Sequence, residues 1–184
     1  MNKSLKIIVL IMQIGGGLLG LGIIGRSLLT IQLTHIAVII HIAFIFVFMF
    51  GIAAGVALIK RLKLGLWLSA IFQAMQIPIL TGPAATYILV SGACLNLYRN
   101  ATGYGFHFLF GSRYYFSIHN SESWLAGFNV IALVLFILLV REIRFEADAA
   151  KISKPQPSME RPSQQYAQAQ EHQTYGSPLR HTLR

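Results

Sequence analysis

The sequence predicts an all-α integral membrane protein: a bundle of four transmembrane helices with a short extracytoplasmic β-hairpin between helices 3 and 4 and a disordered C-terminal tail. Three observations lead to this fold class. Of the 184 residues, 55% are hydrophobic and only 11% are charged, whereas about a quarter are charged in an average soluble domain. The apolar residues fall in long runs, and the basic residues stand at the ends of those runs. We therefore expect the chain in a lipid bilayer.

The first two apolar runs, at 7–25 and 36–59, are each long enough to cross a bilayer as a helix. A cleaved signal peptide is an alternative for the first run, but the run lacks an Ala-x-Ala site and continues past its small residues. Glycines stand four apart in both runs, which permits close helix packing within the chain or, alternatively, with a protein partner or a second copy. These glycines are Gly16, Gly20, Gly51 and Gly55.

The third span is predicted at 64–90 and the fourth at 124–140. The apolar stretch 64–97 is too long for one upright span, because as a helix it would measure about 51 Å against a hydrocarbon core of about 30 Å. Pro78 and Pro83 interrupt it, and proline kinks or ends a helix. We therefore expect one spanning helix with a break near these prolines.

Basic residues are divided unevenly between the two sides of these spans. Of the 15 Lys and Arg residues, 12 fall on the side of the two termini and 3 on the other. By the positive-inside rule both termini face the cytoplasm, and the loop 97–121 is extracytoplasmic. Residues 1–150 then form the transmembrane domain, and 151–184, poor in aliphatic residues, form a disordered cytoplasmic tail. We expect the protein in the cytoplasmic membrane of a prokaryote, with membrane lipids as partners. Nucleic acid is not expected as a partner, since no recognition motif accompanies the formal net charge of +9.

The loop 97–121 shows a strand pattern instead of a helix pattern. Aromatic residues alternate with other residues from Tyr104 to Phe110, and a second aromatic strand is predicted at 113–118. Gly111-Ser112 suits a two-residue type II′ turn, which would pair Phe110 with Arg113. One face of this hairpin would offer a surface for a partner protein or lipid, and an interfacial aromatic belt is the alternative. The candidate residues are Tyr104, Phe106, Phe108, Phe110, Arg113 and Tyr115.

Polar side chains inside the predicted spans are candidates for a ligand pocket. They are His41, Gln73, Gln76 and Asn129. Counted along their helices, His41 and Asn129 both fall about 8 Å below the outer surface. The hypothesis is a small pocket open to the outside and roofed by the aromatic loop. The alternative is that these side chains only join helices by hydrogen bonds.

No nucleophile–base pair, phosphate loop or dinucleotide motif appears, so no catalytic residues are assigned. The histidine spacings match no metal motif, and we expect neither a metal nor a cofactor. The preferred function is a non-catalytic scaffold or accessory subunit that binds a protein or lipid through the aromatic hairpin. A small transporter, channel or ligand-binding subunit that uses the outer-leaflet pocket is the second hypothesis, and a membrane-embedded enzyme is the third.

Overall fold

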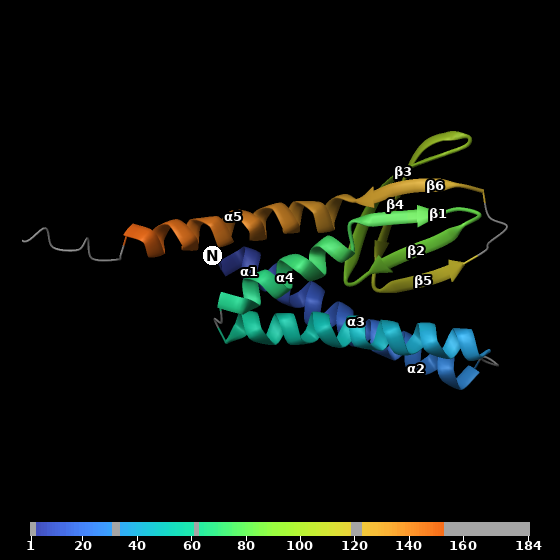
Figure 1. The fold of residues 1–184 in the computed structure, drawn as a ribbon, viewed down its shortest axis with the longest axis horizontal. Coiled ribbons are helices and arrows are strands. Elements are labelled where there is room, and N and C mark those ends of the chain that lie inside the picture. The colour runs from blue at the N-terminus through green and yellow to red at the C-terminus, as the bar shows by residue number, and fades with distance from the viewer. Residues whose placement is uncertain (1–2, 31–33, 61–62, 119–122, 153–184) are drawn as a thin grey trace, which may run out of the picture. The chain divides into compact units, whose positions relative to one another are not determined.

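Helices and strands occur in separate blocks along the chain (Figure 1). The computed structural model describes residues 3–30, 34–60, 63–118 and 123–152. The helices are α1 (Lys3–Leu10), the π-helical turn η1 (Ile11–Gly15) and α2 (Gly16–Thr30), which follow one another without a break, then α3 (His35–Ile59), α4 (Lys63–Met75) and α5 (Val130–Ile152). The strands are β1 (Pro78–Thr81), β2 (Ala85–Val90), β3 (Ala93–Asn100), β4 (Gly103–Phe110), β5 (Arg113–Ile118) and β6 (Leu125–Asn129).

The chain divides into two compact units, Met1–Glu146 and Ala147–Arg184. The first unit holds the whole sheet and both hydrophobic cores. The tail predicted to be disordered, 151–184, lies almost entirely outside the described residues.

The predicted fold class, an all-α bundle of four membrane-spanning helices, is wrong. The described residues form helices together with a six-stranded antiparallel sheet. Two helices, Lys3–Thr30 and His35–Ile59, are long and apolar enough to cross a membrane, by length and composition. The span predicted at 64–90 consists of α4 followed by β1 and β2, and the span predicted at 124–140 begins with β6 and becomes helical only at Val130.

Proline ends α4 before it can span a bilayer. Pro78 has no backbone N–H to donate, and its ring disfavours helical backbone at Ile77. The helix ends with hydrogen bonds that span three residues instead of four. The N–H of Gln76 donates to the carbonyl of Gln73 (3.0 Å), and the N–H of Ile77 donates to that of Ala74 (3.2 Å). With 13 residues, α4 measures about 20 Å, less than the hydrocarbon thickness of about 30 Å.

The sheet is built around one long, bent hairpin. Residues 85–100 and 103–118 run antiparallel, from Asn100 opposite Gly103 to Ala85 opposite Ile118. Both arms are interrupted at the same level, at Ser91-Gly92 and Gly111-Ser112, where the N–H of Gly111 donates to the carbonyl of Gly92 (2.7 Å). β6 and β1 complete the sheet, whose order is β4-β3-β6-β1-β2-β5. We call the two interruptions together the corner.

The two strands predicted at 104–110 and 113–118 are present as β4 and β5, but their predicted partners are wrong. β4 pairs with β3, and β5 pairs with β2, so the two strands form opposite edges of the sheet. Gly111-Ser112 is a corner at which the chain continues, and no type II′ turn joins Phe110 to Arg113. Because the period-two alternation runs through the corner, Phe110 and Arg113 lie on opposite faces.

The corner is held by the π-helical turn η1. A π-helical turn alters the normal helical hydrogen-bond pattern, and two carbonyls in and next to η1 accept hydrogen bonds from the corner. Ser91 Oγ donates to the carbonyl of Met12 (3.1 Å), and Ser112 Oγ donates to that of Gly16 (2.6 Å). Gly92 has a φ of +96°, and a Cβ there would lie 2.9 Å from Met12 Cα. The sheet is thereby attached to the middle of the first helix.

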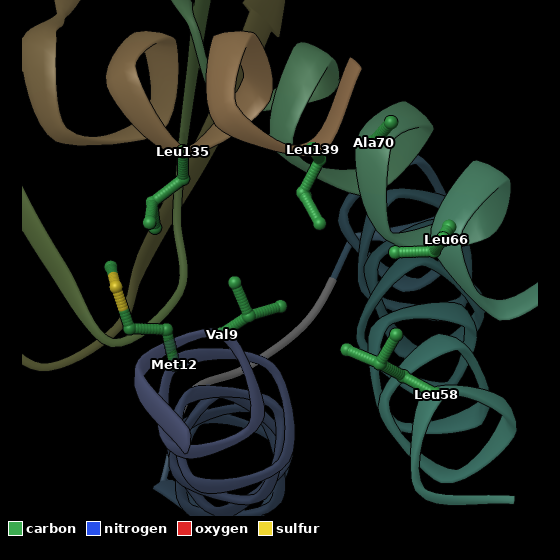
Figure 2. Close-up of a cluster of buried hydrophobic side chains, with 7 residues drawn as sticks. All are labelled: Val9, Met12, Leu58, Leu66, Ala70, Leu135 and Leu139. Atoms are coloured by element: carbon green, nitrogen blue, oxygen red, sulfur yellow. The ribbon is translucent and has the colours of Figure 1, made fainter. Parts of the chain in front are cut away.

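Two hydrophobic cores hold the unit together. Figure 2 shows the first, in which Val9, Met12, Leu58, Leu66, Ala70, Leu135 and Leu139 converge from α1, η1, α3, α4 and α5. The second core joins α2 and α3 to the sheet, and contains Ile24, Phe44, Phe48 and Leu89.

The four glycines predicted to allow close packing are all buried within one chain. A Cβ at Gly16 would collide with Ser91 and Gly92, one at Gly20 with the Phe48 ring, one at Gly51 with the Phe72 ring, and one at Gly55 with Ile14. Close packing within the chain therefore accounts for the glycines at these four positions.

The thiol of Cys94 is fully buried, and burial raises its pKa. Because alkylation requires an accessible thiolate, we expect Cys94 to react slowly with a maleimide in the folded protein at pH 7 and fast after denaturation. Mass spectrometry of the intact chain measures both rates. Rapid labelling of the folded protein would contradict the buried position of Cys94 in β3. If Cys94 reacts slowly, as expected, single cysteines can be introduced elsewhere without removing Cys94.

Candidate functional site

The two faces of the sheet differ in polarity. Successive residues of a strand point to opposite faces, and cross-strand partners share a face, as do Asn96 and His107. This face of the sheet lines an open cavity of about 600 Å³, here called the concave cavity. All six strands contribute to it, including β4 and β5 at opposite edges, so the sheet must curl around this face. Its polar lining includes Thr81, Asn96, Asn100, His107, Arg113 and Ser123.

The lining of the concave cavity carries a positive charge. Arg113 supplies it, and none of the described lining residues is acidic. In the sequence Glu122 is the first acidic residue, outside the described residues, and Glu142 is the next. Burial raises the pKa of the Cys94 thiol, and among smaller effects the positive charge of Arg113 lowers it.

Asn96 adds an unused acceptor to the concave cavity. Its Oδ1 atom is buried and has no hydrogen-bond partner in the described part of the chain. Buried amide oxygens nearly always accept a hydrogen bond from protein or water. This oxygen is thus a position at which a water molecule or a ligand donor would be held.

Two glycines allow the Tyr98 ring to lie along the wall of the concave cavity. A Cβ at Gly105 would lie 2.6 Å from the hydroxyl oxygen of Tyr98, and one at Gly127 would lie 2.7 Å from Tyr98 Cβ. Both glycines stand directly opposite Tyr98 on neighbouring strands. Aromatic side chains commonly cover glycines on an adjacent strand in this way.

The other, convex face of the sheet is apolar, and α3 covers half of it. β2 and β5 form the covered half, where the ring of Tyr114 lies 4.8 Å from that of Phe44 and 6.1 Å from that of Phe48. Tyr87 and Leu89 of β2 pack into the same core.

The other half of the convex face, formed by β4, β3, β6 and β1, is exposed. Tyr104, Phe106 and Phe110 are 83%, 75% and 78% exposed. The register places Leu97 between Phe106 and Phe128, so the apolar surface extends across three strands. We call Tyr104, Phe106, Phe108, Phe110, Leu97 and Phe128 the aromatic face. At one end of it, the Arg99 guanidinium lies 5.3 Å from the centroid of the Tyr104 ring.

His41, a predicted pocket residue, lies between α2 and the sheet. Its Nδ1 is 2.6 Å from the carbonyl of Ala37, which can only accept, so in the neutral ring Nδ1 carries the proton. Nε2 then accepts from the hydroxyl of Ser27 at 3.0 Å. The ring of Tyr114 stands edge-on at 5.7 Å. Both ring nitrogens are therefore used within the chain.

Gln76 and Asn129, two further predicted pocket residues, bind backbone groups. Gln76 Oε1 accepts from the N–H of Ser91 at the corner (2.8 Å). Asn129 Oδ1 accepts from the N–H groups of Ile131 and Ala132 in the first turn of α5 and from that of Leu95 in β3. The two residues thus join α4 and α5 to the sheet.

Gln73, the fourth predicted pocket residue, is fully buried on α4, and neither polar atom of its amide has a partner among the described residues. Ser69, one turn earlier, exchanges hydrogen bonds with Gln13 of η1. None of the four predicted pocket residues lines the concave cavity. They are His41, Gln73, Gln76 and Asn129.

The six predicted surface residues are divided between the two faces. Tyr104, Phe106, Phe108 and Phe110 form most of the aromatic face, whereas Arg113 and Tyr115 line the concave cavity. The site residues predicted from the sequence did not include the other cavity residues Asn96, Tyr98, Asn100 and His107. Leu95 and Leu97 alternate with Asn96 and Tyr98, and this alternation is a signal for a third strand with one face more polar than the other.

Comparison of the chain with known protein families, curated proteins and solved structures finds no match. A function for this chain therefore has to be argued from its own residues and their geometry.

Proposed function

We propose that this chain is an integral membrane accessory protein that binds lipid through its aromatic face. The helices α1–η1–α2 and α3 would anchor it, with both termini in the cytoplasm. The sheet would lie on the outer side, with the aromatic face in the outer leaflet and the concave cavity open to water.

The surface of the two long helices supports a membrane position. Large apolar side chains are exposed along their whole length, at positions where a soluble protein would carry polar groups. Examples are Ile11, Leu18, Leu29, Ile36, Ile39 and Phe46, with exposed fractions between 58% and 88%. A lipid environment satisfies these side chains without any further partner.

The ends of the helices support the orientation. Lys6 Nζ lies 3.4 Å from the carbonyl of Ile59, so the beginning of α1 and the end of α3 are neighbours. Lys3, Lys6, Lys60, Arg61 and Lys63 all belong to this end by sequence. An accumulation of Lys and Arg at one end favours the cytoplasmic side.

The observation that carries the proposal is the bond between Ser112 and Gly16. Gly16 is ten residues after Lys6, or about 15 Å along a helix, half the thickness of the hydrocarbon core. The corner of the sheet is therefore beside the middle of a helix long enough to span. In the proposed orientation, the strands that leave the corner would run at the depth of the outer leaflet.

The polarity of the sheet fits this depth. Sheets in contact with lipid place apolar side chains outside and polar side chains inside, the reverse of a soluble core. Here the aromatic face points out and the concave cavity is polar. In the described part of the chain the outer edge of β4 has no neighbouring strand. At membrane depth such an edge is tolerated where water reaches it. The water-accessible concave cavity, lined by His107 of β4, supplies that water.

Spin labels on neighbouring residues of β4 test the lipid contact. In lipid vesicles, labels at Phe106→Cys and Phe108→Cys should be more accessible to oxygen, which enters the hydrocarbon, than to a water-soluble nickel chelate. A label at His107→Cys, one residue away on the opposite face, should show the reverse preference. Power-saturation measurements give both accessibilities.

Equal exposure of 106 and 107 to the nickel chelate would exclude lipid contact, and low accessibility of 106 to both reagents would indicate a protein partner or a second copy. Orientation is tested separately with Thr102→Cys in the turn between β3 and β4. A membrane-impermeant maleimide should label it in intact cells, and labelling only after lysis would reverse the proposed topology.

A further inference from the structure

We infer that the concave cavity binds a small hydroxylated organic anion, with Arg113 as the group that holds its phosphate or carboxylate. The cavity volume of about 600 Å³ lies within the range of about 300–1,000 Å³ typical of small-molecule sites. This inference does not depend on lipid contact by the aromatic face, since the cavity lies on the other face of the sheet.

The N–H donors of Arg113 and His107 lie at one end of the cavity. Arg113 comes two residues after Gly111, and His107 comes four residues before it, so both lie close to the corner, in β5 and β4 on either side of it. A guanidinium presents a planar fork of N–H donors that binds phosphate or carboxylate with two parallel hydrogen bonds. An imidazole can add one more N–H donor. No described residue of the lining offers a carboxylate to compete for these donors.

The rest of the lining specifies the body of the ligand. The buried Oδ1 of Asn96 lacks a donor, and a hydroxyl group of the ligand would supply one. Tyr98 and Tyr115 offer flat apolar surfaces and hydroxyl groups, while Ile79, Ile88 and Leu125 offer aliphatic surface. A ligand with an anionic end and a short hydroxylated carbon body satisfies all three kinds of lining.

Arg99 provides a matched control for Arg113. Both arginines belong to the same sheet, but Arg99 lies on the convex side over the Tyr104 ring, whereas Arg113 lines the cavity. Both side chains are exposed, so neutral substitutions at either position should leave the fold intact, which a thermal melt verifies.

The probe is glycerol 3-phosphate, with inorganic phosphate beside it, titrated calorimetrically into the full chain in phosphatidylcholine nanodiscs. We expect saturable binding that Arg113→Gln weakens by about 10- to 100-fold, the usual effect of losing hydrogen bonds to a charged group, while Arg99→Gln leaves it unchanged. Asn96→Leu should weaken glycerol 3-phosphate binding but not phosphate binding, because phosphate brings no carbon-bound hydroxyl. Absence of binding, or equal loss in the Arg113 and Arg99 variants, would overturn the inference.

A lipid headgroup and a free solute carry the same anionic chemistry, and the nanodisc composition distinguishes them. If a headgroup is the natural occupant, phosphatidylglycerol in the nanodisc should compete with glycerol 3-phosphate and raise its apparent Kd at least severalfold in the wild-type chain. If a free solute is the occupant, the Kd should be the same in both lipids. In both cases Arg113→Gln must weaken the binding of glycerol 3-phosphate. If phosphatidylglycerol still competes with glycerol 3-phosphate in the Arg113→Gln variant, the result counts against the proposed site.

Discussion

Gly16→Ala is expected to destabilise the protein more than any other single methyl addition to the first helix. A Cβ at this position would overlap the backbone nitrogen of Gly92 and lie 2.5 Å from the carbonyl carbon of Ser91. Because these are backbone atoms at the corner, no rotamer change can relieve the overlap, and the corner must move away from η1. That movement also breaks the bond from Ser112 to Gly16. Overpacking of this kind costs about 1–3 kcal/mol or more.

Gly22→Ala is the matched control, because it lies in the same helix and a Cβ there meets nothing within 4 Å. Alanine should be neutral or stabilise the helix there by about 0.5–1 kcal/mol. Thermal unfolding of both variants in the same detergent, followed by tryptophan fluorescence, makes the comparison. Equal stability of the two variants would mean that the sheet does not contact the first helix at Gly16.

Asn129→Ala is expected to lower the free energy of unfolding by about 3 kcal/mol, since several buried N–H donors would lose their acceptor at about 1–3 kcal/mol each. Asn129 is fully buried, and its Oδ1 accepts from Ile131 at 3.1 Å, from Leu95 at 3.3 Å and from Ala132 at 3.4 Å. The side chain thus caps α5 and binds β3 at the same time. Water cannot replace these acceptors at a fully buried position.

Asn100→Ala is the control for this prediction, because Asn100 makes the same kind of contacts where water can replace them. Its Oδ1 accepts from the N–H groups of Thr102 and Gly103, at 3.0 Å each, in the turn between β3 and β4. We expect a loss of about 1 kcal/mol or less there. Denaturant unfolding of both variants measures the difference, and a larger loss at 100 than at 129 would contradict the capping role of Asn129.

The first two helices could be predicted from the sequence because a single property decides them. The runs at 7–25 and 36–59 are uninterrupted and longer than any strand, and the structure has helices there. The stretch 64–97 is equally apolar, but apolar composition does not distinguish a helix from a buried strand. Pro78 marks the place where α4 has ended and β1 begins, and the prediction treated that proline as a kink within one helix.

The strands of the aromatic loop could be predicted, whereas their partners could not. Alternation from Tyr104 to Phe110 requires only local backbone geometry. Pairing depends on which other strand is available. The residues of β2 had been assigned to a helix, and those of β3 fell partly between the predicted span and the predicted loop and partly at the start of that loop. Without them the nearest partner for β4 was β5, which placed Arg113 on the same face as Phe110. The same error hid the concave cavity, since a two-stranded hairpin cannot enclose one.

The sequence by itself determined two long apolar helices, a basic end beside them, and a period-two aromatic segment. Each of these follows from the length or the local spacing of residue types. Only the tertiary structure decided that Gly111-Ser112 is a corner instead of a turn. Contacts with residues far away in the sequence decide it: Gly92 opposite Gly111, and the carbonyl of Gly16, 96 residues from Ser112. Such long-range contacts leave no periodic signal in the chain, and they separate the aromatic face from the cationic cavity.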